Sequence, residues 1–222
     1  MEHNLPTLQA VLFDMDGLMF NSEDIYYASS VEAARRRGKV YTLEIHKMIM
    51  GTTVEFSMKT IIRELGLTDS WQALGEETQV IFRELLPTML KPMPGLMELL
   101  DFLEENNIPR AIATSTNRKL MEDTLAVYNL EPRFNKTVTG SDISHSKPNP
   151  EIYLKAAAAL GFPPEKCMVL EDSSAGCRAG KNAGAYVVAV PADHSRNQDF
   201  SFVDFVANTL ADPGIRQRLL TR

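Results

Sequence analysis

From Gly95 onward, segments with the apolar spacing of helices alternate with short apolar runs that are typical of buried strands. This alternation predicts a parallel sheet whose strands are joined by crossover helices. The predicted strands are residues 110–114, 136–139, 167–170 and 186–190, and the predicted helices are residues 96–106, 119–128, 150–160 and 173–183. With a further strand at residues 10–13, we expect an α/β fold with a doubly wound (Rossmann-like) parallel sheet core.

The segment between Asn21 and Lys91 has a different pattern, because helical spacing dominates it and no β-branched strand interrupts it. Four helices are predicted there, at residues 25–37, 43–50, 54–65 and 71–86. Residues 18–21 and the proline-marked residues 91–95 are expected to form a two-stranded hinge. We therefore expect a core made of residues 1–20 and 92–222, with a four-helix cap domain inserted at residues 21–91.

The regular alternation of strands and helices ends at Pro191. Residues 192–201 are polar and are expected to form a loop, and residues 209–219 are expected to form a short terminal helix. Neither segment contains a motif to which we assign a function.

Composition places the chain among ordinary globular proteins, because 44% of its 222 residues are hydrophobic, enough to bury a full core. A net charge of -6 without a long basic run argues against a nucleic-acid partner. No apolar stretch approaches the roughly 20 residues of a membrane span, and residues 1–7 lack the charged and apolar regions of a signal peptide. We therefore expect a cytoplasmic protein without a membrane partner, and a monomer by default.

The cysteines and histidines do not indicate a disulfide framework or a zinc site. Cys167 lies at a predicted strand start and Cys177 in a predicted helix, which is typical of reduced core residues. The chain has four histidines without ligand spacing, all expected at the surface or in loops: His3, His46, His145 and His194. No zinc site is therefore predicted.

The residues that can carry chemistry gather where the predicted strands end. They are Asp14-Met15-Asp16-Gly17 after the first strand, Thr114 with Ser115 at the end of the second, Lys147 beyond the third, and Glu171 with Asp172 after the fourth. Open α/β sheets bind ligands at the carboxyl ends of their strands. We therefore expect these side chains to meet at one edge of the sheet.

The first of these motifs contains two acids that suit phosphoryl transfer. Asp14 is the candidate nucleophile, because a carboxylate that attacks phosphorus splits one difficult hydrolysis into two easier steps through an aspartyl-phosphate. Asp16 is the candidate general acid and base, which protonates the leaving alcohol and then activates water. For this role Asp16 must carry a proton at the first step while Asp14 is ionised.

The acids of these motifs would repel a phosphate dianion unless a cation balanced them. Oxygen ligands completed by substrate phosphate favour Mg²⁺ as the cofactor, with four candidate ligands: Asp14, Asp16, Glu171 and Asp172. Lys147 adds a fixed positive charge that can bridge the nucleophile and the phosphoryl oxygens. Thr114, the amide of Ser115 and Asn117 are expected to donate hydrogen bonds to the same oxygens at the start of the next helix.

Each motif alone also has an ordinary structural interpretation. Asp-x-Asp-Gly can form a turn, and the strings that begin at Thr114 and Glu171 can cap the helices that follow. Lys147 can belong to a solvated loop, as most lysines are exposed. The order of the motifs and their joint position at strand ends favour the functional interpretation.

With these residues identified, the chain resembles the haloacid dehalogenase superfamily of phosphohydrolases. The strings FDMDGLM, IATST, SKPNPEIY and VLEDSSAGCRAGKNAG are similar to its four ordered motifs, and the resemblance covers nearly all of residues 8–191. It implies these roles: nucleophile Asp14, acid and base Asp16, phosphate-binding hydroxyl Thr114, phosphate-site lysine Lys147, and metal-binding acids Glu171 and Asp172. It also implies that the backbone carbonyl of Asp16, rather than its side chain, ligates magnesium.

Within the superfamily, the chain is most similar to the group that contains β-phosphoglucomutase, pseudouridine-5′-phosphatase and sugar-phosphate phosphatases. The mutase typically has a histidine where this chain has Tyr26, and a phosphate-gripping arginine where it reads Gly51-Thr52-Thr53-Val54. Without both groups a bisphosphate intermediate is not held, so the resemblance favours a phosphatase, with a mutase as the alternative. Asp16 argues against a 2-haloacid dehalogenase, which lacks the second acid of the first motif.

The resemblance implies a small phosphorylated metabolite as the substrate, either a sugar phosphate or a nucleoside monophosphate. Cap side chains read the leaving group in such phosphatases, which makes Tyr26, Gly51, Thr52 and Thr53 the candidates for specificity. A further alternative is a receiver-type signalling module that holds phosphate without turnover. Such a module needs only about 100–150 residues and has no use for a cap.

Overall fold

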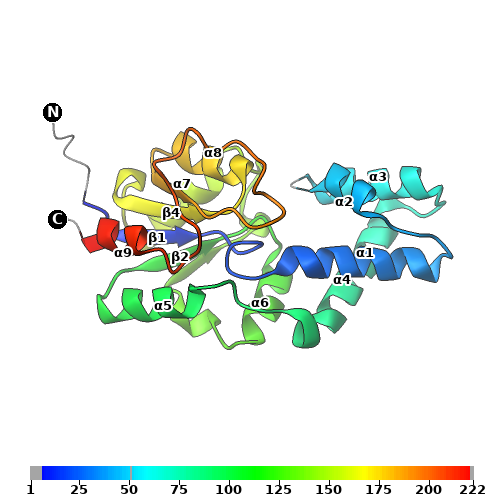
Figure 1. The fold of residues 1–222 in the computed structure, drawn as a ribbon, viewed down its shortest axis with the longest axis horizontal. Coiled ribbons are helices and arrows are strands. Elements are labelled where there is room, and N and C mark those ends of the chain that lie inside the picture. Colours follow the sequence, from blue (N-terminus) through cyan, green and yellow to red (C-terminus); the bar gives the residue numbers. More distant parts are fainter. Residues whose placement is uncertain (1–6, 51, 221–222) are drawn as a thin grey trace. The chain divides into compact units, whose positions relative to one another are not determined.

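The computed structural model describes residues 7–50 and 52–220. The chain divides into two compact units, a core unit of Met1–Asn21 with Lys91–Arg222 and a helical unit of Ser22–Leu90. Figure 1 shows the strands in the first and helices alone in the second. The helical unit is therefore an insertion between two parts of the core unit. Most of the segment tested for a signal peptide, and Gly51 of the helical segment, lie outside the described residues.

A six-stranded parallel sheet forms the centre of the core unit in the described part of the chain, in the order β3-β2-β1-β4-β5-β6. Its strands are β1 Ala10–Phe13, β2 Arg110–Ala113, β3 Lys136–Val138, β4 Cys167–Glu171, β5 Tyr186–Ala189 and β6 Phe205–Val206. β1 pairs with β2 on one side and with β4 on the other. The chain thus winds outward from β1 in both directions, which confirms the predicted doubly wound α/β fold.

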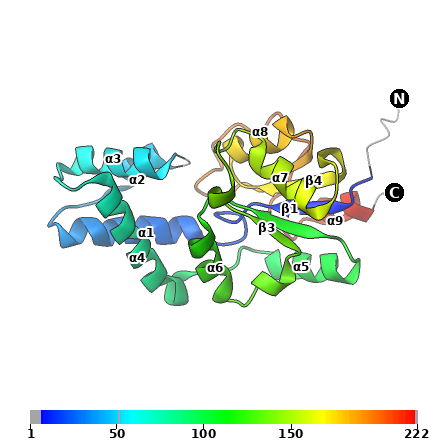
Figure 2. The ribbon, with the colours of Figure 1, turned by 180° about the vertical axis from the view of Figure 1, so that it is seen from behind.

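Helices cover both faces of the sheet. Figures 1 and 2 show α7 Glu151–Leu160 and α8 Ser174–Asn182 on one face, and α5 Leu96–Glu105 and α6 Arg118–Ala126 on the other. All four residues of β1 are fully buried, as expected for a central strand that is covered on both faces. The buried strand itself cannot contact a ligand. A ligand can be reached only by the residues that follow β1, beginning with Asp14, at the carboxyl end of the strand.

The sequence analysis misses β6 and places the last helix too early. β6 has only two residues, too few for the two-residue period that identifies a strand. The terminal helix α9 is Pro213–Leu220 rather than residues 209–219. It begins at Pro213 because proline, which lacks an N–H, suits the first position of a helix.

The helical unit contains the four predicted helices: α1 Ser22–Arg36, α2 Leu43–Ile49, α3 Val54–Leu65 and α4 Trp71–Met89. The side chains of Thr42, Thr53 and Ser70 accept hydrogen bonds from backbone N–H groups and cap α2, α3 and α4. Apolar side chains of all four helices form a separate core, which includes Ala33, Ile45, Ile61 and Leu74. No helix in the described residues is both long and apolar enough to cross a membrane.

α4 continues three residues beyond its predicted end at residue 86, despite Pro87. A proline ring removes one backbone hydrogen bond, which usually ends a helix. Here Pro87 lies in the last turn, and the N–H of Leu90 still donates to the Leu86 carbonyl at 3.1 Å. The loss of one bond close to the helix end is therefore tolerated.

The two chain segments that link the units are paired with each other. The N–H of Asn21 donates to the Lys91 carbonyl at 3.1 Å, and the N–H of Lys91 donates to the Asn21 side-chain oxygen at 2.7 Å. The N–H of Met93 donates to the Met19 carbonyl at 2.8 Å. Asn21 thus uses both its backbone and its side chain to join the two segments.

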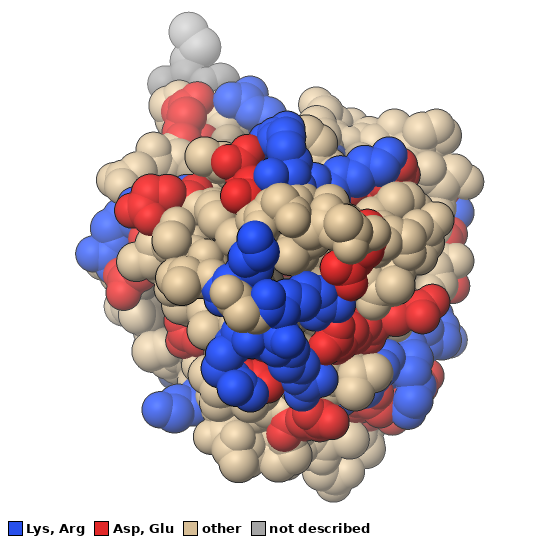
Figure 3. Space-filling view, turned by 90° about the vertical axis from the view of Figure 1, so that its right-hand side faces the viewer, with Lys and Arg blue, Asp and Glu red and all other residues tan. Residues whose placement is uncertain are grey.

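Charged side chains of both signs gather on the face drawn in Figure 3. Within the helical unit, such groups form ion pairs: Arg37 bonds to Asp69 and to Glu77, both at 2.6 Å. Arg36 bonds to Glu77 at 3.2 Å and to Glu32 at 3.0 Å. These pairs tie the end of α1 to the start of α4 and to the loop before it.

The cysteines behave as predicted, but one histidine, His46, does not. Cys167 and Cys177 are free and buried in the core unit. His46 is buried in α2 and contacts the Tyr41 hydroxyl at 3.1 Å through Nδ1, so the expected surface or loop position is wrong for it. The buried ring is tolerated because a polar partner satisfies it. His145 is exposed as expected, and His194 lies in a loop but reaches the candidate site.

Two glycines of the helical unit should respond to alanine in opposite ways. A Cβ at Gly75, inside α4, would make ordinary contacts of 3.5 Å with Met58 and 3.6 Å with Val54. Gly75→Ala should therefore stabilise the protein by about 0.5–1 kcal/mol, because alanine favours a helix. Gly66 ends α3 with φ 61°, so Gly66→Ala should destabilise by about 1 kcal/mol.

Urea denaturation followed by tryptophan fluorescence measures both effects, because Trp71 in α4 is the single tryptophan of the chain. Shifts of the two midpoints in the same direction would contradict this account of the two glycines.

Candidate active site

The predicted site residues of the core unit lie at one edge of the sheet. Asp14 directly follows β1, and its N–H donates to the Leu170 carbonyl of β4 at 3.0 Å. Thr114 directly follows β2, and Asp172 directly follows β4. Because β2, β1 and β4 are parallel neighbours, their carboxyl ends bring these three residues together.

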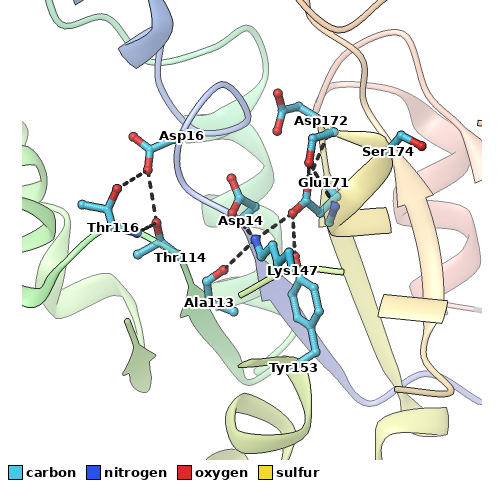
Figure 4. A network of polar contacts seen from close by, with 12 residues as sticks. Asp14, Asp16, Ala113, Thr114, Thr116, Lys147, Tyr153, Glu171, Asp172 and Ser174 are labelled. Carbon is cyan, nitrogen blue, oxygen red and sulfur yellow. Dashed lines mark hydrogen bonds and ion pairs between the residues drawn. The ribbon is translucent and has the colours of Figure 1, made fainter. Parts of the chain in front are cut away.

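Lys147 lies at the centre of the site, as Figure 4 shows. Its ammonium group bonds to Asp14, to Glu171 at 2.7 Å and to the Ala113 carbonyl at 3.2 Å. Only 8% of the lysine side chain is exposed, so it points inward from a loop whose neighbouring residues are exposed. Lys147 thus joins Asp14 to Glu171, the last residue of β4.

Glu171 is held by four donors. Its Oε1 accepts from Lys147 and from the Tyr153 hydroxyl at 2.9 Å, and its Oε2 accepts from the Ser173 N–H at 3.0 Å and hydroxyl at 2.9 Å. A carboxylate has about four acceptor sites in all. Glu171 is therefore fixed in one orientation. A Cβ at Gly176 in α8 would lie 1.6 Å from Oε1, so only glycine leaves room for this carboxylate.

Asp16 points toward the loop after β2. Its Oδ2 accepts hydrogen bonds from Thr114 at 3.1 Å and from Thr116 at 2.7 Å, while its Oδ1 is buried without a hydrogen-bond partner. Both acceptor positions of Oδ2 are thus used by hydroxyl groups. A proton on this carboxyl group would therefore sit on Oδ1, the oxygen available for proton transfer.

The loop after β2 differs from the prediction in one respect. α6 begins at Arg118, so Ser115 lies before the helix and not at its first turn. The side-chain oxygen of Asn117 caps α6 by accepting from the Leu120 N–H at 3.0 Å. Thr114 is fully buried and accepts from the Thr116 N–H at 3.1 Å. The loop is braced by Gly140, whose N–H donates to the Thr116 carbonyl at 2.9 Å.

Burial sets the charge balance of the site. Burial raises the pKa of Asp14 well above its ordinary value, although Lys147 opposes this. Burial and the charge of Glu171 likewise raise the pKa of Asp172. Burial also acts to raise the pKa of Glu171, but the charge and hydrogen bond of Lys147 and the donors of Ser173 hold it below its ordinary value. Burial would lower the pKa of Lys147, yet Asp14 and Glu171 raise it, so Lys147 stays charged.

Three of the four predicted metal ligands cluster. Oxygens of Asp14, Glu171 and Asp172 lie within 4.8 Å of one another, and all three residues are buried. Clustered carboxylate oxygens of this kind fit a hard divalent cation such as Mg²⁺. Glu171 already accepts four hydrogen bonds, so Asp14 and Asp172 are the better ligands. The Asp16 side chain points to Thr114 and Thr116 instead, which agrees with a role outside the metal shell.

The specificity candidates lie in the helical unit. The Tyr26 ring packs on Phe82 with ring centres 4.5 Å apart. The Thr52 hydroxyl donates to the Ile49 carbonyl at 2.7 Å, and the Thr53 side chain caps α3. Gly51 lies outside the described residues.

Four residues of the site were not identified from the sequence: Thr116, Tyr153, Ser173 and His194. Tyr153 and Ser173 are part of the motif strings, and the strand-end rule does not select them because they sit in or before helices. His194 follows β5 and contacts Asp172 Oδ2 through Nε2 at 2.6 Å. The available signal was its position beyond the end of the fifth strand, in a loop to which the sequence analysis assigned no function.

The sequence of the chain matches a protein family over most of its length. The family model described as haloacid dehalogenase-like hydrolase matches residues 11–190. A phosphorylated carbohydrates phosphatase of Thermotoga maritima is 36% identical over 181 residues, which are 80% of this chain and 82% of that protein. A Drosophila melanogaster protein named "probable pseudouridine-5′-phosphatase" is 33% identical over 207 residues, which are 90% of this chain and 89% of that protein.

Solved structures show the same fold. CbbY from Rhodobacter sphaeroides, in complex with phosphate, has a TM-score of 0.82 at 25% identity and covers 93% of this chain and 96% of its own. A HAD hydrolase of family IA, variant 3, from Entamoeba histolytica has a TM-score of 0.85 at 26% identity and covers 96% of this chain and 98% of its own. The similarity thus extends over residues of both units.

Gly176→Ala should disable the site without unfolding the protein. The new methyl group takes the place of the Glu171 carboxylate and moves it away from Lys147 and Tyr153. We expect kcat for hydrolysis of p-nitrophenyl phosphate to fall by about 100-fold, because small displacements of positioned groups have effects of this size. Gly75→Ala is the matched control, since it makes the same exchange in a helix without a clash. Wild-type kcat in a folded Gly176→Ala protein would show that the position of Glu171 is unimportant.

Proposed function

Because this chain belongs to the haloacid dehalogenase-like hydrolases, we propose that it is a Mg²⁺-dependent phosphatase that acts on a small phosphomonoester through an aspartyl-phosphate at Asp14. The observation that carries the proposal is the buried ion pair of Asp14 with Lys147, beside the acids Glu171 and Asp172. Relatives named as phosphatases support the reaction class.

In the first step, a carboxylate oxygen of Asp14 attacks phosphorus and the bond from phosphorus to the leaving oxygen breaks. Asp16 gives the proton on Oδ1 to that oxygen, so the leaving group departs as an alcohol. Lys147 holds Asp14 in place and balances part of the charge on the phosphoryl oxygens. The products of this step are the free alcohol, the aspartyl-phosphate and an ionised Asp16.

In the second step, water attacks the phosphorus of the aspartyl-phosphate. Asp16 removes one proton from this water as the new bond forms, and the bond between phosphorus and Asp14 breaks. Inorganic phosphate leaves, Asp14 is again a carboxylate and Asp16 is again protonated. The Thr116 hydroxyl, which donates to Asp16 Oδ2 at 2.7 Å, holds Asp16 in one orientation through both steps.

Asp14 and Asp172, with Glu171 beside them, would hold Mg²⁺, as would the backbone carbonyl of Asp16 by family resemblance. When bound, the cation would neutralise charge on the transferring phosphoryl group and keep Asp14 ionised. We also propose that Thr114, the N–H of Ser115 and Asn117 donate to phosphoryl oxygens. The Thr114 hydroxyl donates to Asp16 in this structure, so it would turn from Asp16 to the phosphoryl group of a bound substrate. Thr114 and Ser115 follow β2 directly, which supports this role.

The substrate is proposed to be a sugar phosphate or a nucleoside monophosphate. Support comes from the names of two relatives, a phosphorylated carbohydrates phosphatase and a probable pseudouridine-5′-phosphatase. Both names describe phosphate esters of small polar molecules. We propose that Tyr26, Gly51, Thr52 and Thr53 determine which of these esters is preferred.

Phosphate release from a panel of sugar phosphates and nucleoside monophosphates tests the proposal. We expect turnover with Mg²⁺, none after chelation with EDTA, and recovery when Mg²⁺ is restored. Asp14→Asn should lower kcat by about 1,000-fold or more, because the amide cannot form the intermediate. Arg196→Ala is the control and should keep wild-type kcat, because the Arg196 side chain is exposed and pairs with the exposed Asp193.

Other outcomes point to other functions. Conversion of one sugar phosphate isomer into another without phosphate release would support a mutase. Stable phosphorylation of Asp14 without turnover would support a receiver-type module. Turnover that survives both chelation and Asp14→Asn would contradict the proposed mechanism.

Tyr26→Phe tests the specificity residues. The phenylalanine ring keeps the packing on Phe82 but removes one hydroxyl group. We expect kcat/KM for the preferred ester to fall by about 3- to 10-fold, the value of one hydrogen bond, with little change for p-nitrophenyl phosphate. Tyr41→Phe is the matched control, because its hydroxyl contacts His46 within the helical unit. An unchanged substrate ranking would exclude Tyr26 from recognition.

A further inference from the structure

The chain after β5 returns to the site beyond the family match, which ends at residue 190. The N–H of Val190 donates to the Glu171 carbonyl at 2.7 Å, so the chain leaves β5 beside the last residue of β4, which Asp172 follows. A tight turn follows, in which the N–H of Ser195 donates to the Ala192 carbonyl at 3.0 Å. Ser195 is fully buried at the base of this turn, and the residue before it is His194.

The turn is anchored independently of His194. The N–H of Ser174, in α8, donates to the Gln198 side-chain oxygen at 2.7 Å, and its hydroxyl donates to the Asp199 carbonyl at 2.8 Å. The Arg178 guanidinium lies 4.1 Å from the centre of the Phe202 ring. These contacts fix the loop to the helix that follows Asp172.

His194 reaches Asp172 through a space that Gly17 provides. The distance from His194 Nε2 to Asp172 Oδ2 is 2.6 Å, and the two side chains are 22% and 5% exposed. A Cβ at Gly17 would lie 2.5 Å from Asp172 Oδ2 and 2.8 Å from His194 Cε1. Gly17 follows Asp16, so three separate segments of the chain close around one carboxylate.

We propose that His194 is a positioning residue that donates its Nε2–H to Asp172 and so fixes Asp172 for the divalent cation. A carboxylate that binds a cation is ionised and only accepts hydrogen bonds, so Nε2 must carry the proton in the loaded protein. The bond occupies Oδ2 and leaves Oδ1 for the cation. Outer partners of this kind orient metal ligands and change metal affinity. The inference rests on the proposed Mg²⁺ dependence.

Calorimetric titration of the full chain with Mg²⁺, in the absence of substrate, tests this role. His194→Ala should weaken Mg²⁺ binding by about 10- to 100-fold. His194→Gln should restore most of the affinity, because its side-chain amide can donate to Asp172 from a similar position. Arg196→Ala is the control in the same loop, since Arg196 is exposed and pairs only with Asp193 among the contacts described for it. Its Mg²⁺ affinity should equal that of the wild type.

The outcomes separate this inference from the proposed function. Wild-type Mg²⁺ affinity in folded His194→Ala, or tighter binding, would overturn the role of His194 and leave the phosphatase proposal standing. A wild-type protein that binds no Mg²⁺ would overturn both. ¹⁵N NMR of the wild-type histidine rings gives a measurement that needs no folded alanine variant. Nε2 of His194 should be protonated in the Mg²⁺-loaded protein, and an unprotonated Nε2 would overturn the inference.

Discussion

The ammonium group of Lys147, buried between Asp14 and Glu171, is the interaction on which the arrangement of the site depends. An unpaired charge in a protein interior costs several kcal/mol, so the ends of β1 and β4 and the loop after β3 are all drawn to this group. One lysine does not balance the site, because Asp172 adds a third acid. A dication would bring the charge of these four groups to neutrality. It would therefore keep Asp14 ionised against burial and the neighbouring acids, which raise the pKa of Asp14.

Most of the site could be predicted because it obeys a rule of topology. Asp14, Thr114 and Asp172 each follow a strand, and parallel strands end at a shared edge. Lys147 follows no strand directly, and it was identified from its motif and from the order of that motif among the others.

His194 could not be predicted, because a loop anchored by Gln198 and Asp199 brings it to Asp172. Neither the periodicity nor the spacing of the sequence indicates the course of that loop. β6 was missed for a different reason, since two residues carry no readable period. The helical unit was predictable because its helices are long and have clear caps.

Glycines decide how closely the acids approach the backbone. Glu171 occupies the place where a Cβ at Gly176 would stand, and Asp172 lies against Gly17. Gly140 plays a similar part, because a Cβ there would lie 2.1 Å from the Ser115 carbonyl oxygen. Carboxylates that pack directly against glycine backbone are shielded from water by the backbone itself rather than by apolar side chains. The glycines therefore allow the burial of the carboxylates, and that burial sets the electrostatics of the site.

The pairing of Asn21 with Lys91 means that the chain leaves the core unit and re-enters it side by side. The two ends are separated by about the 5 Å spacing of adjacent strands, a gap that a short turn can span. The core sheet therefore does not depend on the length of what is inserted there. An insertion with such closely spaced ends can be exchanged, lengthened or lost over evolution while the acids around Lys147 keep their places, so new substrates can be acquired without rebuilding the catalytic groups.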